Sequence, residues 1–378
     1  MTLDLETQID QPEQAVPELV KPSRTPSLPK VISDKITDDG GTYDTNVKHL
    51  LQPGNENDLC TWLKDMRLIR SSMNCPTEGC NEKPLLWRTV RQVDKYGWTC
   101  NDCKKRQALR DGSIFQQTKC DLKHCIQMIV AWCMDIPYET VASYLDTKQH
   151  FVRKVYEILT QVTEQYVEAH SNEWLLGGTG PNGNILIVDE FPTGCMTENL
   201  IDVPKTKKRN NQNHTVLCIA EVSQVPPRMW MRILGTKSEK TLKTQEILKQ
   251  YGMVEEALNE IGTHSAPGSI LIANRRARYC NYENVKELKG FKVIGIEELQ
   301  IHDPPEKNEL SFNLETIWQT GLGICEDIQS LAQDNAVRDL HEYLWRRRFA
   351  KTTAQAFNSI LQHITEFYQF SSDSVSSS

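Results

Sequence analysis

The sequence predicts an α/β fold, a mixed sheet with flanking helices, preceded by a small cysteine-rich module and a helical module. Three observations indicate this order. Two close cysteine pairs lie within residues 73–113, helical spacing dominates residues 121–170, and short apolar runs alternate with helical segments after the glycine-rich stretch 177–183. A chain of 378 residues is long enough for two or three compact domains.

The composition is that of a globular protein with no membrane partner. Hydrophobic residues make up 39% and charged residues 25%, and the longest nearly apolar stretch, around 125–134, is too short to span a bilayer. The N-terminus is acidic and has no apolar core, so no secretory signal is expected. The twelve cysteines are therefore expected in a reducing compartment, where clustered cysteines bind metal more often than they form disulfides.

The charge is unevenly distributed along the chain. The formal net charge is -7, which by itself argues against simple binding to a polyanion. Residues 1–45 carry four basic and nine acidic side chains, a net of -5, whereas residues 86–110 carry seven basic and two acidic ones, a net of +5. An acidic tail beside a basic segment is a mild indication of a nucleic-acid partner.

These patterns divide the chain into five parts. We expect a disordered acidic tail over 1–45 and a second disordered tail over 371–378. Between them we expect an N-terminal helix with a metal-binding ribbon over 46–115, a helical DNA-binding module over 116–176, and the α/β domain over 184–370. Within 46–115, helical spacing covers residues 56–72.

The two cysteine pairs predict a structural zinc site. Cys75 and Cys80 form one pair, Cys100 and Cys103 the other, and nineteen residues separate the pairs. The intervening segment alternates like a hairpin, which brings the pairs together, and four thiolates complete the tetrahedral shell that zinc prefers. The alternative is four ordinary buried cysteines. Basic side chains decorate this segment and are candidates for phosphate contacts or for a merely solvated face: Arg88, Arg91, Lys95, Lys104, Lys105, Arg106 and Arg110.

Residues 137–159 have the pattern of a helix-turn-helix. A short helix over 137–145 precedes a longer one that starts near Lys148, with Asp146 and Thr147 as candidate caps. Lys148, Arg153 and Lys154 are the candidate DNA-contacting side chains on the second helix. A plain helical hairpin that packs on its neighbours is the alternative.

The last large part reads as three strands, helix, strand, helix, strand and further helices, which is the order of the ribonuclease H-like fold. The strand candidates are 185–191, 214–222, 229–234, 269–274 and 291–296, and the helix candidates are 241–262, interrupted near Gly252, 281–290, and the region from Asn313 onward with a weak point at Gly321 and Gly323. Asp189 stands at the end of the first strand, with Glu190 pointing the other way. A carboxylate at that place is costly unless it binds something, caps a backbone group or pairs with a cation.

Several segments together resemble the Merlin-type transposases and their bacterial insertion-sequence relatives. They are the cysteine pairs, DGSIF at 111–115, VDEF at 188–191, ILIANRRARY at 270–279, LETIW at 314–318 and HEYLWRRRF at 341–349. Members of that family cut and join DNA with an Asp-Asp-Glu site that holds two magnesium or manganese ions. The resemblance implies that Asp189 is the first metal ligand and Glu315 the last; alone, Glu315 reads as an acid that suits a helix N-terminus.

The sequence departs from the family pattern at the second catalytic position. The family places Asp five residues before the tyrosine of ILIANRRARY, and this chain has Asn274 there. An amide oxygen ligates magnesium but carries no charge and cannot bridge two dications as a carboxylate does. Near Glu315, the family's polar lead-in is replaced by Leu-Ser-Phe at 310–312, and Gly-Leu-Gly at 321–323 replaces the expected basic residue.

The prediction that follows is a transposase-derived DNA-binding protein whose strand cleavage is impaired or lost. An active transposase and a zinc-dependent protein-interaction scaffold are the alternatives. Arg275, Arg276 and Arg278 are candidates either for DNA contact or for pairing with local acids, and the basic loop 205–209 for DNA contact or nuclear import. Trp345 is expected to pack inward, with the arginines at 346–348 reaching solvent or phosphate. A nuclear or otherwise intracellular location and self-association are expected by analogy with transposases.

Overall fold

The structure is a computed structural model that describes residues 41, 43–80, 83–91, 93–178, 185–192, 214–223, 225–235, 246–299 and 309–370. The expected tails over 1–40 and 371–378 and the basic loop 205–209 lie outside these ranges. The first described element, η2 (Tyr43–Val47), begins within the stretch expected to be a disordered tail. Tyr43 is buried there, with its ring edge on Phe357 at a centroid distance of 5.4 Å.

The cysteine-rich module is a small antiparallel sheet in the order β1-β2-β3, formed by β1 (Leu86–Thr89), β2 (Tyr96–Thr99) and β3 (Arg106–Gln107). Trp87 of β1 stands opposite Trp98 of β2, and their rings meet edge to face at 5.1 Å. The ammonium of Lys64, from the neighbouring helix α1 (Glu56–Asp65), lies 3.1 Å from the centroid of the Trp87 ring. This cation–π contact fixes the hairpin against the helical part of the chain.

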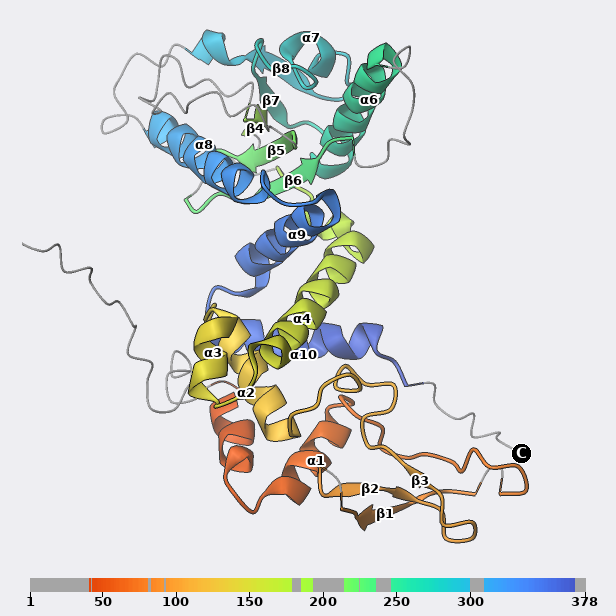
Figure 1. Cartoon of the computed structure of the whole chain (residues 1–378). Helices are drawn as coiled ribbons and strands as arrows, with labels where there is room; N and C mark the ends of the chain where they lie inside the picture. The colour runs from red at the N-terminus through yellow and green to blue at the C-terminus, as the bar shows by residue number, and fades with distance from the viewer. Residues whose placement is uncertain are drawn as a thin grey trace, which may run out of the picture.

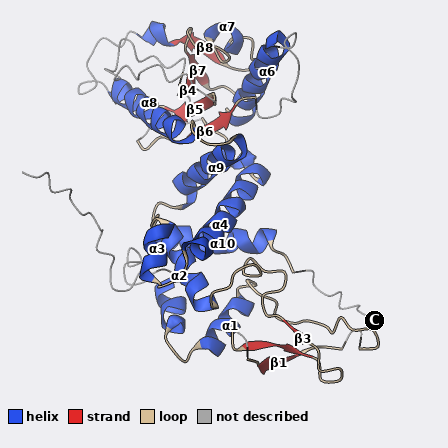
Figure 2. Cartoon of the chain, in the orientation of Figure 1, coloured by secondary structure: helices blue, strands red, loops and turns tan. Residues whose placement is uncertain are grey.

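The helical module continues with three helices, α2 (Leu122–Cys133), α3 (Tyr138–Tyr144) and α4 (Gln149–Ala169) (Figures 1 and 2). The single stretch expected over 121–170 is therefore divided, and the helix expected over 56–72 ends at Asp65. Arg67, Asp135 and Asp146 follow the ends of α1, α2 and α3 with φ angles of 56°, 57° and 47°. Helices commonly end on such a left-handed residue, and glycine usually supplies it. The absence of glycine is why the ends of α1 and α2 were not visible in the sequence, whereas the end of α3 agrees with the short helix expected over 137–145.

The α/β part contains a five-stranded mixed sheet in the order β6-β5-β4-β7-β8. Its strands are β4 (Ile185–Phe191), β5 (Val216–Glu221), β6 (Met229–Ile233), β7 (Ile270–Ala273) and β8 (Lys292–Gly295). β5 runs antiparallel to both of its neighbours, whereas β7 and β8 run parallel to β4. β4 lies at the centre, which explains why its sequence is one apolar run instead of an alternating pattern.

Helices cover both sides of the sheet. Figure 1 shows α8 (Glu309–Ile328) on one side, and α6 (Glu246–His264) and the short α7 (Tyr282–Val285) on the other. The single-turn η6 (Ile296–Leu299) follows β8. The interruption expected near Gly252 and the weak point expected at Gly321 and Gly323 are both wrong, since α6 and α8 run through these glycines.

Two C-terminal helices connect the sheet to the helical module. α9 (Gln333–Phe349) packs along α4 and on β6, and α10 (Thr353–Phe367) packs on α4 and α2. As expected, Trp345 is buried, and its indole donates to His363 Nδ1 over 2.9 Å. The arginines that follow do not simply reach solvent. They donate to the carbonyls of Trp132, Pro227 and Glu173.

Within the described residues, no helix is both long and apolar enough to cross a membrane.

The two glycines of α8 differ in their surroundings. A Cβ added to Gly321 would lie 2.5 Å from two ring carbons of Phe191 on β4, whereas a Cβ on Gly323 would meet nothing within 4 Å. Gly321 is therefore the point at which α8 lies directly on the central strand.

We expect Gly321→Ala to destabilise the protein by roughly 1–3 kcal/mol, because an inserted methyl group in a packed contact forces the helix or the ring to move. Gly323→Ala is the matched control and should stabilise by up to about 1 kcal/mol, since alanine is the better helix former. Chemical denaturation of the two variants checks the opposite signs. Equal effects of the two substitutions would contradict the close approach of α8 and β4.

Candidate functional site

The ends of two parallel strands bring Asp189 and Asn274 together. Val188 of β4 pairs with Ala273 of β7, so the next residue of each strand emerges at the same edge of the sheet. Asn274 Nδ2 lies 3.4 Å from Asp189 Oδ1, a long contact, and both side chains are 2% exposed. Two of the three residues predicted as catalytic are therefore neighbours.

Asp189 is held by neutral donors. Within the described part of the chain its carboxylate accepts from the backbone N–H of Glu190 at 2.9 Å, the indole N–H of Trp318 at 3.0 Å and the amide of Asn274. Burial raises the pKa of Asp189 to about 7, although the Glu190 N–H and the Trp318 indole oppose this shift. The carboxylate is thus only partly ionised near neutral pH.

The Asn274 side chain has a fixed orientation. Its Oδ1 accepts from the backbone N–H of Arg276 at 2.9 Å, and this leaves Nδ2 to face Asp189. The amide therefore presents a donor, and not an oxygen ligand, to the carboxylate.

The side chain of Glu190 lies on the opposite face of the sheet from that of Asp189, as the alternation along β4 predicts. Its carboxylate accepts from the backbone N–H groups of Arg278 at 2.5 Å and Tyr279 at 2.9 Å. Burial raises the pKa of Glu190, while these two donors lower it. Glu190 therefore holds the loop after β7, which also carries Asn274.

Among the described residues, Glu315 has no hydrogen bond to this pair. It lies in the second turn of α8 and not at the start of the helix, so its interpretation as an N-terminal acid is wrong. The carboxylate is half-buried and accepts from Gln319 on its own helix at 3.0 Å. Trp318, one turn further along, is the residue that α8 places on Asp189.

The four cysteines predicted as ligands do form such a cluster. The Sγ atoms of Cys75, Cys80, Cys100 and Cys103 all lie within 4.8 Å of one another, and those of Cys75 and Cys103 are 3.6 Å apart. A metal ion at the centre of a thiolate tetrahedron with ~2.3 Å bonds needs sulfur–sulfur distances of about 3.8 Å. The geometry suits a metal ion such as zinc.

The protonation of these thiols also suits a metal. The backbone N–H of Lys105 lowers the pKa of Cys103 to about 6, so this thiol is largely a thiolate at neutral pH. Desolvation raises the pKa of Cys80 to about 11, and its contact with Cys103 adds to the shift. A metal ion that binds all four would displace the remaining protons.

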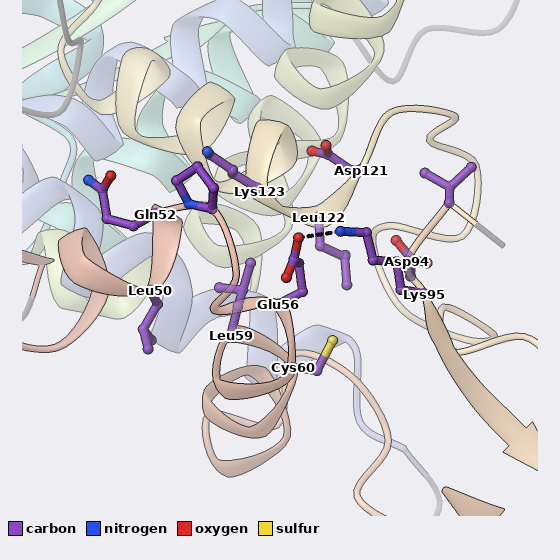
Figure 3. Close-up of a pocket in the computed structure, with 12 residues that line it drawn as sticks. Leu50, Gln52, Glu56, Leu59, Cys60, Asp94, Lys95, Asp121, Leu122 and Lys123 are labelled. Atoms are coloured by element: carbon purple, nitrogen blue, oxygen red, sulfur yellow. Dashed lines mark hydrogen bonds and ion pairs between the residues drawn. The ribbon is translucent and has the colours of Figure 1, made fainter. Parts of the chain in front are cut away.

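A cavity of about 180 Å³ separates the hairpin turn from the helical module (Figure 3). Lys95 of the turn pairs with Glu56 of α1 at its wall. Beside it, Asp94 receives the guanidinium of Arg110, with Nε to Oδ2 at 2.7 Å, and Arg110 also donates to Thr118. Two of the candidates for phosphate contact therefore have structural partners: Lys95 joins the hairpin turn to α1, and Arg110 joins it to the segment that precedes α2.

The remaining cations predicted to contact DNA fall into two groups. Five on the hairpin have exposed side chains without an ion pair among the described residues: Arg88, Arg91, Lys104, Lys105 and Arg106. In the loop after β7, by contrast, Arg275 lies within 4 Å of carboxylates from Glu283, Glu297 and Glu298. For Arg275 the structure supports the alternative of pairing with local acids. Arg276 and Arg278 are exposed.

The short helix α3 and the longer helix α4 follow each other and pack together, in the order that the sequence predicts for a helix-turn-helix. The turn between them uses Asp146 in the left-handed region, so the missing glycine is no obstacle. Neither Asp146 nor Thr147 caps α4, whose N-cap residue is Lys148 without a side-chain hydrogen bond. Lys148 and Arg153 are exposed near the start of α4 and Lys154 is half-buried, and Arg153 lies 3.6 Å from Glu157.

Trp318 is the site residue that sequence reasoning missed. Its spacing of three from Glu315 places both on one side of α8, which was the available signal.

Comparison with protein-family models, with curated proteins and with solved structures found no match.

The raised pKa of Asp189 predicts a specific dependence of stability on pH. Its folded pKa of about 7 lies above the ordinary value of 3.8, so between these values the folded state holds more protons than the unfolded state. Its contribution to stability is complete below about pH 4 and falls by at most about 1.4 kcal/mol per pH unit until about pH 7. Thermal unfolding at pH 5, 6, 7 and 8 should therefore show wild type losing stability relative to Asp189→Asn, with no further change above pH 8.

The comparison of two variants cancels protonation of the cysteine cluster, which both contain. A difference in melting temperature that stays constant with pH would contradict a buried carboxyl with a raised pKa.

Proposed function

We propose that this chain is a DNA-binding protein descended from cut-and-paste transposases, in which the strand-cleaving site has become a neutral hydrogen-bonded cluster. The observation that carries the proposal is the meeting of Asp189, Asn274 and α8 at one sheet edge. Asp189 lies on β4, the first strand of this sheet in chain order, Asn274 follows β7, the fourth strand, and α8 is a later helix. A ribonuclease H-like nuclease draws its carboxylates from these three places. The mixed sheet, with its first strand at the centre and only its second strand antiparallel to the others, supports the same fold.

The charges at this edge argue against cleavage. Two-metal catalysis uses about three carboxylates to offset two dications. Here the second position is an amide that donates to Asp189, and the indole N–H of Trp318 occupies the other carboxylate oxygen. An amide at the second position supplies no negative charge, so this set of residues offsets less of the charge of two dications than an Asp-Asp-Glu set does.

We further propose that the four-cysteine cluster is a zinc ribbon. Its own small core, in which Leu85 and Trp98 are buried beside Cys75 and Cys100, is too limited to hold a hairpin without metal. A shell of four sulfurs leaves no open position, so the zinc is structural.

Cys103→Ser should remove about one equivalent of zinc per chain, because three thiolates bind zinc far more weakly than four. Cys103 is exposed, so this substitution tests ligation and not packing. Cys60→Ala is the control, because Cys60 is buried in α1 at the cavity beside the hairpin and lies outside the cluster. The Cys60→Ala protein should contain as much zinc as wild type. Elemental analysis of the purified proteins measures both, and full zinc retention by Cys103→Ser would contradict the ribbon.

The positions of the exposed basic side chains support DNA binding. The exposed cations of the cysteine-rich module and the exposed start of α4 offer positive charge, and among them the described residues show a close ion pair only between Arg153 and Glu157. The opposite face of α4 buries Val152, Val155 and Leu159 in the core, so its polar face is turned outward. A helix in this position after a short helix and a turn is suited to enter a groove.

We expect the full chain to bind a duplex with an affinity that falls steeply with salt, since phosphate contacts release counterions. The triple variant Lys148→Ala/Arg153→Ala/Lys154→Ala should bind more weakly, and its salt slope should fall by about one for each phosphate that the removed side chains had neutralised. Fluorescence anisotropy between 50 and 200 mM salt measures this. Lys289→Ala, an exposed lysine after α7, is the charge control and should bind as wild type does.

Two outcomes would contradict the proposal. Absence of salt-dependent binding would favour the interaction scaffold. Manganese-dependent nicking of the duplex by wild type, abolished in Asp189→Asn, would show that the site still cleaves.

A further inference from the structure

The interface between α4 and α9 contains an acidic cluster that the proposed DNA-binding function does not use. The two helices lie side by side between the sheet and the rest of the helical module (Figure 1). Thr160 Oγ1 donates to Glu342 at 2.5 Å, and Arg338 Nε lies 3.0 Å from Glu164 Oε2. Glu164 and Glu168 are four residues apart on α4 and therefore share one face of the helix.

A buried histidine completes the cluster from the opposite helix. Glu164, Glu168 and His341 each place one ligand atom within 4.8 Å of the others. His341 is 1% exposed, and its Nδ1 is buried without a hydrogen-bond partner among the described residues. A buried polar atom is normally paired, so an unpartnered nitrogen on an imidazole ring that lies within 4.8 Å of two carboxylates indicates a missing ligand.

The surroundings suit a cation. Arg338 pairs with one oxygen of Glu164, which leaves the other oxygen available and orients the carboxylate from behind, as partners of metal ligands do. On the far side of His341, Arg232 is offset by Glu256 and Glu260 at 3.9 and 4.0 Å. Glu168 is exposed, which gives an ion a route from solvent.

We propose that Glu164, Glu168 and His341 bind a divalent transition-metal ion that clamps α4 to α9. Two carboxylates and one imidazole are the donors that manganese, iron(II) and zinc accept, and they differ from the four thiolates of the ribbon. Because α9 also packs on β6, the ion would fix the helix with the DNA-contact candidates to the sheet.

Manganese binding by the full chain, with its cysteine cluster loaded with zinc, tests this. Loss of the free Mn²⁺ signal in electron paramagnetic resonance should show about one ion bound per chain, and Mn²⁺ should raise the melting temperature. Glu168→Gln should weaken binding by at least about tenfold and abolish the shift in melting temperature. Glu168 is exposed, so the variant is not expected to unfold. Glu157→Gln, another exposed acid on α4, is the control and should behave as wild type does.

Pulsed measurements on the bound ion provide a readout that packing alone would not change. Imidazole nitrogen coupling to Mn²⁺ should be present in wild type and absent in His341→Gln. No binding at millimolar Mn²⁺, or binding that survives in Glu168→Gln, would overturn the proposal. Binding abolished by Asp189→Asn instead would place the ion at the sheet edge, which overturns this inference and separately contradicts the neutral site.

Discussion

The contact between α8 and the central strand determines what the sheet edge can do. Gly321 lets the helix lie on Phe191, at a distance where a single Cβ would be 2.5 Å from the ring. Trp318 lies one turn before Gly321 on the same side of the helix, so this approach brings its indole to Asp189. Glu315 lies one turn before Trp318, and its carboxylate accepts a hydrogen bond from Gln319 on the same helix. One close packing contact therefore gives the buried carboxylate a neutral donor in place of a cation.

The helix α4 has a comparable role for the whole chain. Its first turns and the residue before them carry the exposed side chains of Arg153 and Lys148, while its length packs on α9 and α10, which follow the sheet in the chain. Polar contacts at the α9 interface, such as Thr160 with Glu342 and Arg338 with Glu164, fix the register of the two helices. Specific polar pairs in a packed interface set register more than they add stability. The buried residues of the helical module and of the sheet form one continuous hydrophobic core.

Local signals in the sequence predicted the elements, and long-range packing determined the rest. The cysteine spacing located the cluster, and the apolar run at 185–191 located the central strand, because both signals are contained within a few residues. The ends of α1 and α2 were missed, since Arg67 and Asp135 take a conformation for which glycine is the usual sign. The partnership of Trp318 with Asp189, 129 positions apart, depends on where α8 packs. Likewise, Arg110 looked like a surface cation until the fold placed Asp94 beside it.

The persistence of Asp189 in a neutral cluster has a physical explanation that does not need catalysis. A buried carboxylate without a cation is costly, and the raised pKa expresses that cost. Replacing it with an apolar residue would nevertheless leave the indole N–H of Trp318 without its acceptor in a dry interior, at a penalty of roughly 1–3 kcal/mol. The amide of Asn274 would also lose its partner. Once α8 has packed on β4, the acceptor is required by the fold itself, so an acid at this position has a structural role that is independent of any catalysis.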